Sequence, residues 1–243
     1  MGTLLRKEIA SFFHSFTGYL VIAVFLLITG LFLFVFQGEM NILRSGYASV
    51  DGLFILAPWI FLFLAPAISM RFFSDEKKSG TIELLLTYPI SDISIVLAKF
   101  TAGIILLTIS LLPTLLYVFT VYALGSPPGN LDGGATIGAY IGLLLIGGMY
   151  VAIGTLVSSF TDNQIISFII SAVICFVFFT GFDSLAEIIP STINKNIITS
   201  IGIQQHYNSI SRGVIDTRDL IYFVSCIIFF LYLTTLNIRK KRR

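Results

Sequence analysis

The sequence predicts an all-α integral membrane protein with six transmembrane helices, an N-terminal interfacial helix and short re-entrant or surface helices before the last span. Composition is the first observation behind this prediction. Hydrophobic residues make up 56% of the 243 residues, charged residues only 12%, and the mean hydropathy is +0.94. A soluble domain carries about 25% charged residues, so half that share could not cover a soluble surface. Disorder is excluded as well, because disordered chains are poor in apolar residues and rich in charge.

The second observation is the presence of six long stretches without Asp, Glu, Lys or Arg. A helix needs about 20 apolar residues to cross a bilayer, and each charge at its centre costs roughly 2.5–3.5 kcal/mol. The charge-free stretches are 9–38, 52–70, 100–131, 133–161, 163–182 and 220–238. Within one transmembrane domain covering 1–243, we therefore expect spans near 17–37, 53–71, 96–124, 136–158, 163–183 and 219–238.

The third observation is the distribution of lysine and arginine. With six spans both termini lie on one side, and that side carries eleven of the fifteen cations. Because cytoplasmic loops are enriched in Lys and Arg, we expect both termini in the cytoplasm. The basic run 239–243 is interpreted as a stop-transfer anchor attracted to anionic lipid. The net charge of +2 is too small to suggest a nucleic-acid partner.

The first element expected is an amphipathic helix ahead of span one. We expect it to lie in the cytoplasmic interface, with a plain extension of the first span as the alternative. A cleaved signal peptide does not fit, because the apolar stretch is too long and no small-residue cleavage site follows it. The apolar residues of this helix have the spacing of one helical face, and they are Leu5, Ile9, Phe12, Phe13 and Phe16.

The segment 71–92, between spans two and three, is the most informative part outside the membrane. Gly80 permits a break in the chain, Thr81 is placed to cap a short helix through 82–87, and Pro89 ends that helix. A bare loop needs no run of leucines, so this helix either lies on lipid or fits a groove on a partner. The segment also contains a compact charged run and further candidate contact residues: Asp75, Glu76, Lys77, Lys78, Glu83, Leu84 and Leu85.

Two features mark the second half of the chain. The fourth span is rich in glycine, which lets helices approach closely; dense packing is one interpretation and a moving or gating interface is the other. The outward segment 183–219 is too interrupted to span a membrane and too apolar for a free loop, so short re-entrant or surface helices are expected. The glycines of the fourth span are Gly138, Gly142, Gly147, Gly148 and Gly154.

Motifs that carry chemistry are missing from the sequence. It has no H-E-x-x-H, G-x-S-x-G or Walker A pattern, so we expect no enzyme activity, no metal site and no cofactor bound by this chain. His14 and His206 lie far apart, and Cys175 and Cys226 lie in apolar runs. We expect no carboxylate or lysine inside a span, which argues against a transporter driven by protons or sodium. If the protein moves a substrate, another protein must supply the energy.

The run Asp75–Ser91 resembles the signature loop of ABC-2 type permeases, in which acidic and basic residues precede Gly-Thr-x-Glu-x-Leu-Leu and a Pro-x-Ser. The segments Leu4–Phe13 and His206–Asp219 resemble the gliding-motility-associated permease subunit of that family. The second of them is also similar to permeases of the nitrous-oxide-reductase maturation type. Those permeases usually read His-Phe-Glu-Ser where this chain reads His-Tyr-Asn-Ser, so a carboxylate is missing at Asn208.

The resemblance implies a permease dimer in the bacterial cytoplasmic (inner) membrane, each half docked on a separate cytoplasmic ATPase that holds ATP and magnesium. In this family a coupling helix between spans two and three enters a cleft in the ATPase, and residues 81–87 take that place. Glu83 is then the polar residue expected to meet the ATPase, and the charged run 75–78 is expected to orient the approach. The implied partners also include a second copy or a related permease, and an auxiliary membrane protein of the gliding system.

The sequence therefore predicts the permease subunit of an ATP-driven export system of gliding-motility type. Two alternatives stay open. One is a non-transporting membrane scaffold or anchor for a motility or secretion assembly, which the glycine-rich fourth span would suit. The other is a permease of the nitrous-oxide-reductase maturation type.

Overall fold

The computed structural model describes residues 1–44, 46–127, 129–188, 192–213 and 216–242. Within these ranges the chain is helical and has no strand, and six helical segments are long and apolar enough to cross a membrane. The predicted all-α fold with six spanning helices is confirmed. The six segments are Phe16–Val35, Asp51–Lys78, Asp92–Leu124, Gly133–Phe160, Gln164–Ile188 and Thr217–Arg242.

Four of these segments change helical geometry along their length. Pro113 explains one change, because it lacks the N–H that an α-helix needs and therefore sits in a 3₁₀ turn. The segments consist of α2 (Phe16–Gly30) with the π-helical η1 (Leu31–Val35), α3 (Asp51–Ser69) with α4 (Arg71–Lys78), α6 (Asp92–Leu111) with η2 (Leu112–Thr114) and α7 (Leu115–Leu124), and α9 (Gln164–Phe176) with η3 (Val177–Gly181) and α10 (Phe182–Ile188). The other two are the continuous helices α8 (Gly133–Phe160) and α13 (Thr217–Arg242).

Four short helices complete the described chain: α1 (Gly2–His14), α5 (Thr81–Thr87), α11 (Thr192–Thr199) and α12 (Ile203–Ser211). The expected apolar face of α1 is partly wrong. Leu4 and Phe12 are its buried residues, whereas Phe16 is 79% exposed. The reason is Ser15, which adopts an extended conformation, caps α2 and thereby places Phe16 on the next helix.

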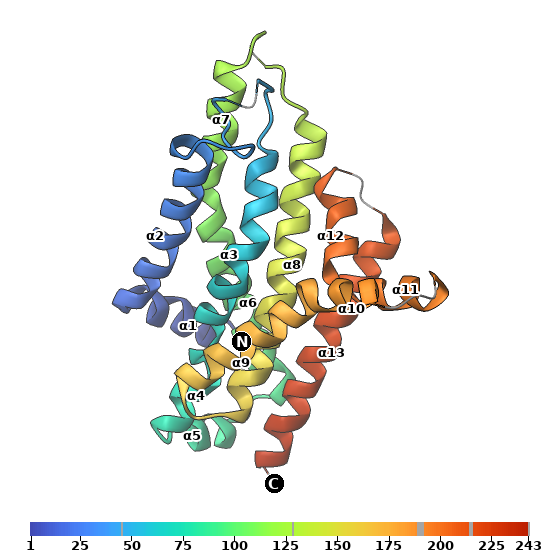
Figure 1. The fold of residues 1–243 in the computed structure, drawn as a ribbon. Coiled ribbons are helices and arrows are strands. Elements are labelled where there is room, and N and C mark those ends of the chain that lie inside the picture. Colours follow the sequence, from blue (N-terminus) through green and yellow to red (C-terminus); the bar gives the residue numbers. More distant parts are fainter. Residues whose placement is uncertain (45, 128, 189–191, 214–215, 243) are drawn as a thin grey trace.

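The bundle is organised around α8, which packs against α3, α6, α9, α12 and α13 (Figure 1). Side chains on every face of α8 are buried, as expected of a central helix. Figure 1 shows α5, α4 and the C-terminus of α13 at one end of the bundle, which we call the α5 end. At the opposite end lie the start of α8 and the loops after η1 and α7. The helices α10 and α11, which precede α12 and α13 in the sequence, lie across the long axis of the bundle (Figure 1).

Polar caps define where several spanning helices begin. The side chains of Ser15, Ser91, Asp132 and Asn163 each accept a hydrogen bond from a main-chain N–H of the first turn of the helix that follows. Such a cap satisfies one of the amides that a helix start leaves unpaired, and each contributes about 1 kcal/mol. The caps therefore place the helix starts, and with them the α4–α5–α6 turn, at fixed points of the sequence.

Candidate functional site

The α5 helix protrudes from the α5 end because two residues reverse the chain around it. Gly80 has φ +70°, a left-handed conformation that glycine adopts without strain. Thr81 does not supply the expected cap, since Gly80 occupies the cap position and the Thr81 hydroxyl instead bonds to that of Ser79 at 2.9 Å. At the other end Tyr88 is extended ahead of Pro89, which stops the helix as predicted.

The short α5 helix has one face on the bundle and one face outward. Ile82 and Leu85 are partly buried and pack against the hydrophobic core. Glu83 and Thr87 are exposed, and Leu84 is 64% exposed. The outward face therefore offers an apolar leucine beside a single carboxylate, a combination suited to a partner's groove or to a membrane surface.

Most of the charged run ahead of α5 turns toward the chain itself. The carboxylate of Asp75 accepts a hydrogen bond from the side-chain amide of Gln164 at the start of α9. Lys77 donates to the main-chain carbonyl of Ser159 near the end of α8. Only Lys78 of the four charged residues is classed as exposed, so it is the member of this run best placed to meet a partner.

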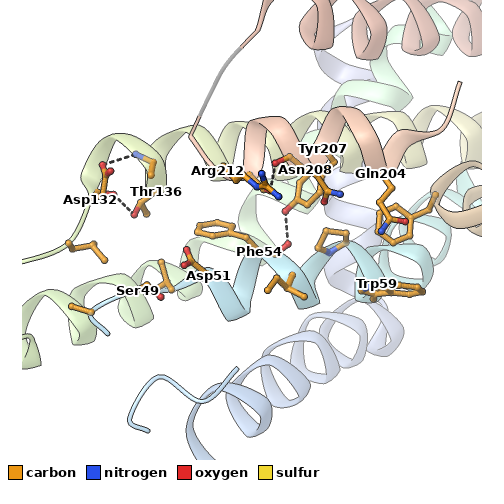
Figure 2. Close-up of a pocket in the computed structure, with 18 residues that line it drawn as sticks. Ser49, Asp51, Phe54, Trp59, Asp132, Thr136, Gln204, Tyr207, Asn208 and Arg212 are labelled. Atoms are coloured by element: carbon orange, nitrogen blue, oxygen red, sulfur yellow. Dashed lines mark hydrogen bonds between the residues drawn. The ribbon is translucent and has the colours of Figure 1, made fainter. Parts of the chain in front are cut away.

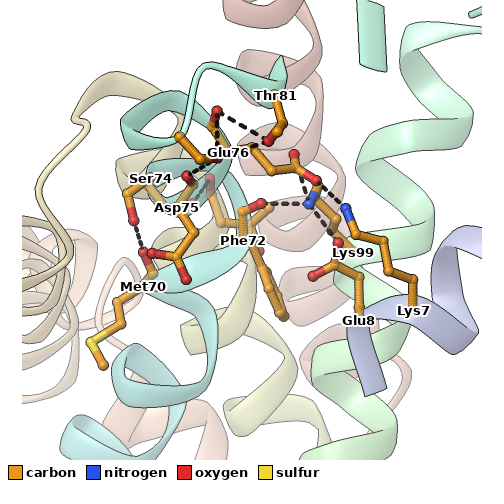
Figure 3. A network of polar contacts seen from close by, with 12 residues as sticks. Lys7, Glu8, Met70, Phe72, Ser74, Asp75, Glu76, Thr81 and Lys99 are labelled. Atoms are coloured by element: carbon orange, nitrogen blue, oxygen red, sulfur yellow. Dashed lines mark hydrogen bonds and ion pairs between the residues drawn. The ribbon is translucent and has the colours of Figure 1, made fainter. Parts of the chain in front are cut away.

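A buried charge cluster joins α1, α4 and α6 (Figure 3). Lys99 on α6 has 0% exposure, and its Nζ lies 2.7 Å from Oε1 of Glu8 and 3.0 Å from Oε2 of Glu76. It also donates to the carbonyl of Phe72, and Lys7 reaches Oε1 of Glu76 at 3.0 Å. Two cations therefore balance two carboxylates, which makes the burial of Lys99 tolerable.

Two consequences follow from this cluster. The expectation that no lysine lies inside a span is wrong at the α5 end, because Lys99 belongs to the third spanning segment and is shielded there by carboxylates from elsewhere in the chain. Burial alone would lower the pKa of Lys7, but the hydrogen bond and negative charge of Glu76 outweigh it and raise that pKa. Lys7 therefore stays charged at neutral pH and holds α1 against α4.

The C-terminal end of α13 holds the turn between α5 and α6. Nη1 of Arg242 lies 2.7 Å from Oδ1 of Asp92 and 3.0 Å from the carbonyl oxygen of Ile90, and Nη2 lies 3.1 Å from that of Tyr88. The planar guanidinium is suited to such a set of convergent acceptors. Arg242 thus fastens the α5–α6 turn in addition to the attraction to lipid expected of the basic run. No local sequence signal indicates its contact with Asp92, which lies 150 residues away in the sequence.

The glycines of α8 lie where neighbouring elements come close. A Cβ on Gly138 would lie 2.9 Å from Gly213, and one on Gly142 would lie 2.9 Å from Ile210 of α12. On Gly147 and Gly154 it would lie 2.6 Å from Leu107 and 1.8 Å from Ser69, whereas on Gly148 the nearest atoms stand at 3.3 Å. The column therefore allows close contact with α3, α6 and α12 in turn.

A cavity of 610 Å³ lies at the end of the bundle opposite α5, between the first turns of α3 and α8 and the side of α12 (Figure 2). Trp59, Phe54 and Phe179 supply aromatic surface, while Asp51 and Arg212 supply opposite charges. The end of the bundle opposite α5, which we call the cavity end, therefore offers a mixed apolar and polar chamber to a ligand. Figure 2 also shows the hydroxyl of Tyr207 donating to the carbonyl of Phe54, at 2.7 Å, which fastens α12 to α3.

His206 connects α12 to the first turn of α13. Its Nδ1 lies 2.7 Å from Oδ1 of Asp219 and its Nε2 lies 3.0 Å from the carbonyl oxygen of Ser200. The ring stacks on Tyr222 at a centroid distance of 4.0 Å. The sequence singled out His206 by position alone, and the pairing with Asp219 required the folded chain. Within the described residues no three His, Cys, Asp or Glu side chains gather as a metal site.

Comparison with known proteins assigns the chain to a family. The family model described as ABC-2 family transporter protein matches residues 3–236, which include all six spanning segments as far as the last turn and a half of α13. None of the curated protein sequences compared with the chain matches it. The match agrees with the six spanning helices of the described chain. The chain belongs to the ABC-2 transporter family, whose members are the membrane permeases of ABC systems.

Proposed function

We propose that this chain is the permease subunit of an ATP-driven exporter of gliding-motility type, and that α5 is the element that docks on a separate cytoplasmic ATPase. The observation that carries the proposal is the arrangement around α5. The helix exposes Glu83 and Leu84, while the residues on both sides of it are fastened to the bundle by Glu76 and Arg242. A protruding helix on a fixed base transmits a push to the bundle, whereas a mobile loop would absorb it.

The energy source in this proposal is the partner. The sequence contains no Walker A motif, so ATP and magnesium are assigned to the ATPase and not to this chain. Closure of two ATPase subunits around ATP would press on α5, and the α4–α5–α6 unit would carry that movement into the spans.

The α5 end faces the cytoplasm in this proposal, and the membrane is the bacterial inner membrane. Support comes from the cations gathered at this end, which include Lys7, Lys78 and the exposed run at the end of α13. The functional unit would pair this chain with a second copy or a related permease. An auxiliary membrane protein of the gliding system would complete it.

Gentle solubilisation of native membranes, followed by affinity purification of the tagged chain, tests the proposal. We expect an ATPase subunit with a Walker motif to co-purify in near-equal amount. A second permease in the same fraction would identify a heterodimer. Recovery of the tagged chain with structural motility proteins alone would overturn the exporter and favour the membrane scaffold. Recovery of copper-site maturation proteins would replace the motility type with the nitrous-oxide-reductase type.

A further inference from the structure

The two ends of α13 are fastened to different working parts of the molecule. We propose that α13 links the α5 segment to the cavity, with Arg242 and Asp219 as the positioning residues at its two ends. The inference rests on the proposed docking of an ATPase at α5. It adds that movement at α5 changes the shape of the cavity through α13.

At the α5 end the link is made by the guanidinium of Arg242. Its three hydrogen bonds reach the residue after α5, the turn, and the first residue of α6: Tyr88, Ile90 and Asp92. Because one planar guanidinium bonds to all three acceptors, a movement of any one of them strains the bonds to the other two. Displacement of α5 therefore pulls on the last turn of α13.

At the cavity end the link is made by Asp219 and Tyr222. Asp219 accepts from His206 at 2.7 Å, and the hydroxyl of Tyr222 donates to the carbonyl of Ile201 at 2.6 Å. The ring of His206 therefore bridges the carboxylate of Asp219 and the carbonyl oxygen of Ser200. The first turn of α13 thus holds the turn that leads into α12.

Between these ends α13 is continuous over 26 residues, a rod of about 39 Å at 1.5 Å per residue. It packs along α8, where Gly148 presents no side chain to it and a Cβ there would stand 3.4 Å from Ile227. Near its C-terminal end α13 is also fastened to α8, because the side-chain amide of Asn237 donates to the carbonyl oxygen of Ser159 at 2.7 Å and to its hydroxyl at 2.8 Å. A pull on the C-terminal end of α13 is therefore carried along the continuous helix, and the end of α8 moves with it.

The cavity responds because α12 is held on both sides. Its first half is tied to α13 through His206, while Tyr207 is tied to α3 through the carbonyl of Phe54. Asn208 on α12 and Arg212, the residue directly after it, line the cavity. A shift of α13 relative to α3 therefore moves these two side chains and alters the opening.

The test uses the permease–ATPase complex in nanodiscs, where both faces are accessible. Asn208→Cys is introduced in a Cys226→Ser background, and its reaction rate with a polar maleimide is measured without nucleotide and with ATP plus vanadate. We expect the rate to change about fivefold on trapping. Arg242→Gln and Asp219→Ala should each bring the ratio of the trapped rate to the nucleotide-free rate close to one. Because they interrupt one link, the double variant should lose no more than either single variant.

Lys240→Gln and Glu187→Gln serve as matched controls, since each removes one exposed charge, from α13 or from α10, and should leave the ratio intact. Tyr222→Phe gives a milder break of the cavity-end link if Asp219→Ala fails to fold. A ratio that survives both Arg242→Gln and the cavity-end variants would overturn the link. A parent complex that hydrolyses ATP but reacts at the same rate with and without trapping would also overturn the link, while the proposed function would stand. Absence of any ATPase in the complex would overturn the proposed function instead.

Discussion

Lys99 is the buried cation that pairs with two carboxylates at the α5 end. It is fully shielded, and the two carboxylates that neutralise it come from α1 and α4. Removing one partner of a buried ion pair costs about 3–5 kcal/mol because a charge is left without compensation, whereas replacing the whole group by apolar residues is often neutral. Lys99 is therefore expected to decide whether α1 stays on the bundle.

Lys99→Met should destabilise the protein by about 3–5 kcal/mol, since Glu8 and Glu76 would remain buried near each other. The triple variant with Glu8→Gln and Glu76→Gln should recover most of this loss. Thermal unfolding in detergent measures both. A single variant as stable as the parent would show that Lys99 is not enclosed by these carboxylates.

Gly154 gives a second prediction for a single position. A Cβ there would lie 1.8 Å from Oγ of Ser69, so Gly154→Ala should destabilise the α3–α8 contact by about 1–3 kcal/mol. Gly148→Ala is the matched control, because its Cβ would stand 3.3 Å from the nearest atom, at the flexible tip of Ile104. Equal melting temperatures for the two variants would contradict the close α3–α8 contact.

The α5 helix depends on the left-handed Gly80 that precedes it. Gly80→Ala should strain the turn by about 1–2 kcal/mol and favour extension of α4 through it. Combined with Glu83→Gln, the change should lower stimulation of the ATPase without removing the protein from the membrane. Gly46→Ala is the control, since Gly46 has φ +73° and lies in a loop far from α5 in the sequence. Unchanged stimulation in the double variant would rule out coupling through α5.

What the sequence could predict follows from which forces act locally. Charge-free stretches and glycine or proline breaks lie in consecutive residues, so the spanning helices, α5 and its end at Pro89 were predictable, whereas the cap expected from Thr81 was wrong. The contacts of Lys99, Arg242 and His206 join elements brought together only by folding. Arg242 illustrates the limit: a basic run beside a span indicates lipid attraction, and only the fold brings Asp92 within 2.7 Å.

In the proposed account the bundle works through its two ends, the α5 end and the cavity end, and α8 and α13 pack side by side between them (Figure 1). The proposed orientation makes a direct prediction about them. In intact cells, in a Cys226→Ser background, Asn130→Cys near the cavity end should react with a membrane-impermeant maleimide, whereas Lys78→Cys should react only after the membrane is opened. The reverse pattern would invert the orientation and contradict docking of a cytoplasmic ATPase on α5.

Photo-crosslinking in native membranes decides between a protein partner and lipid at α5. A photoreactive residue replaces Leu84, which is 64% exposed on α5, and in a matched variant it replaces Leu116, which is 66% exposed on α7. The account predicts an adduct with a nucleotide-binding ATPase subunit from position 84 and none from position 116. Adducts with lipid alone at both positions would contradict it, because α5 would then rest on the membrane surface and no ATPase would engage it.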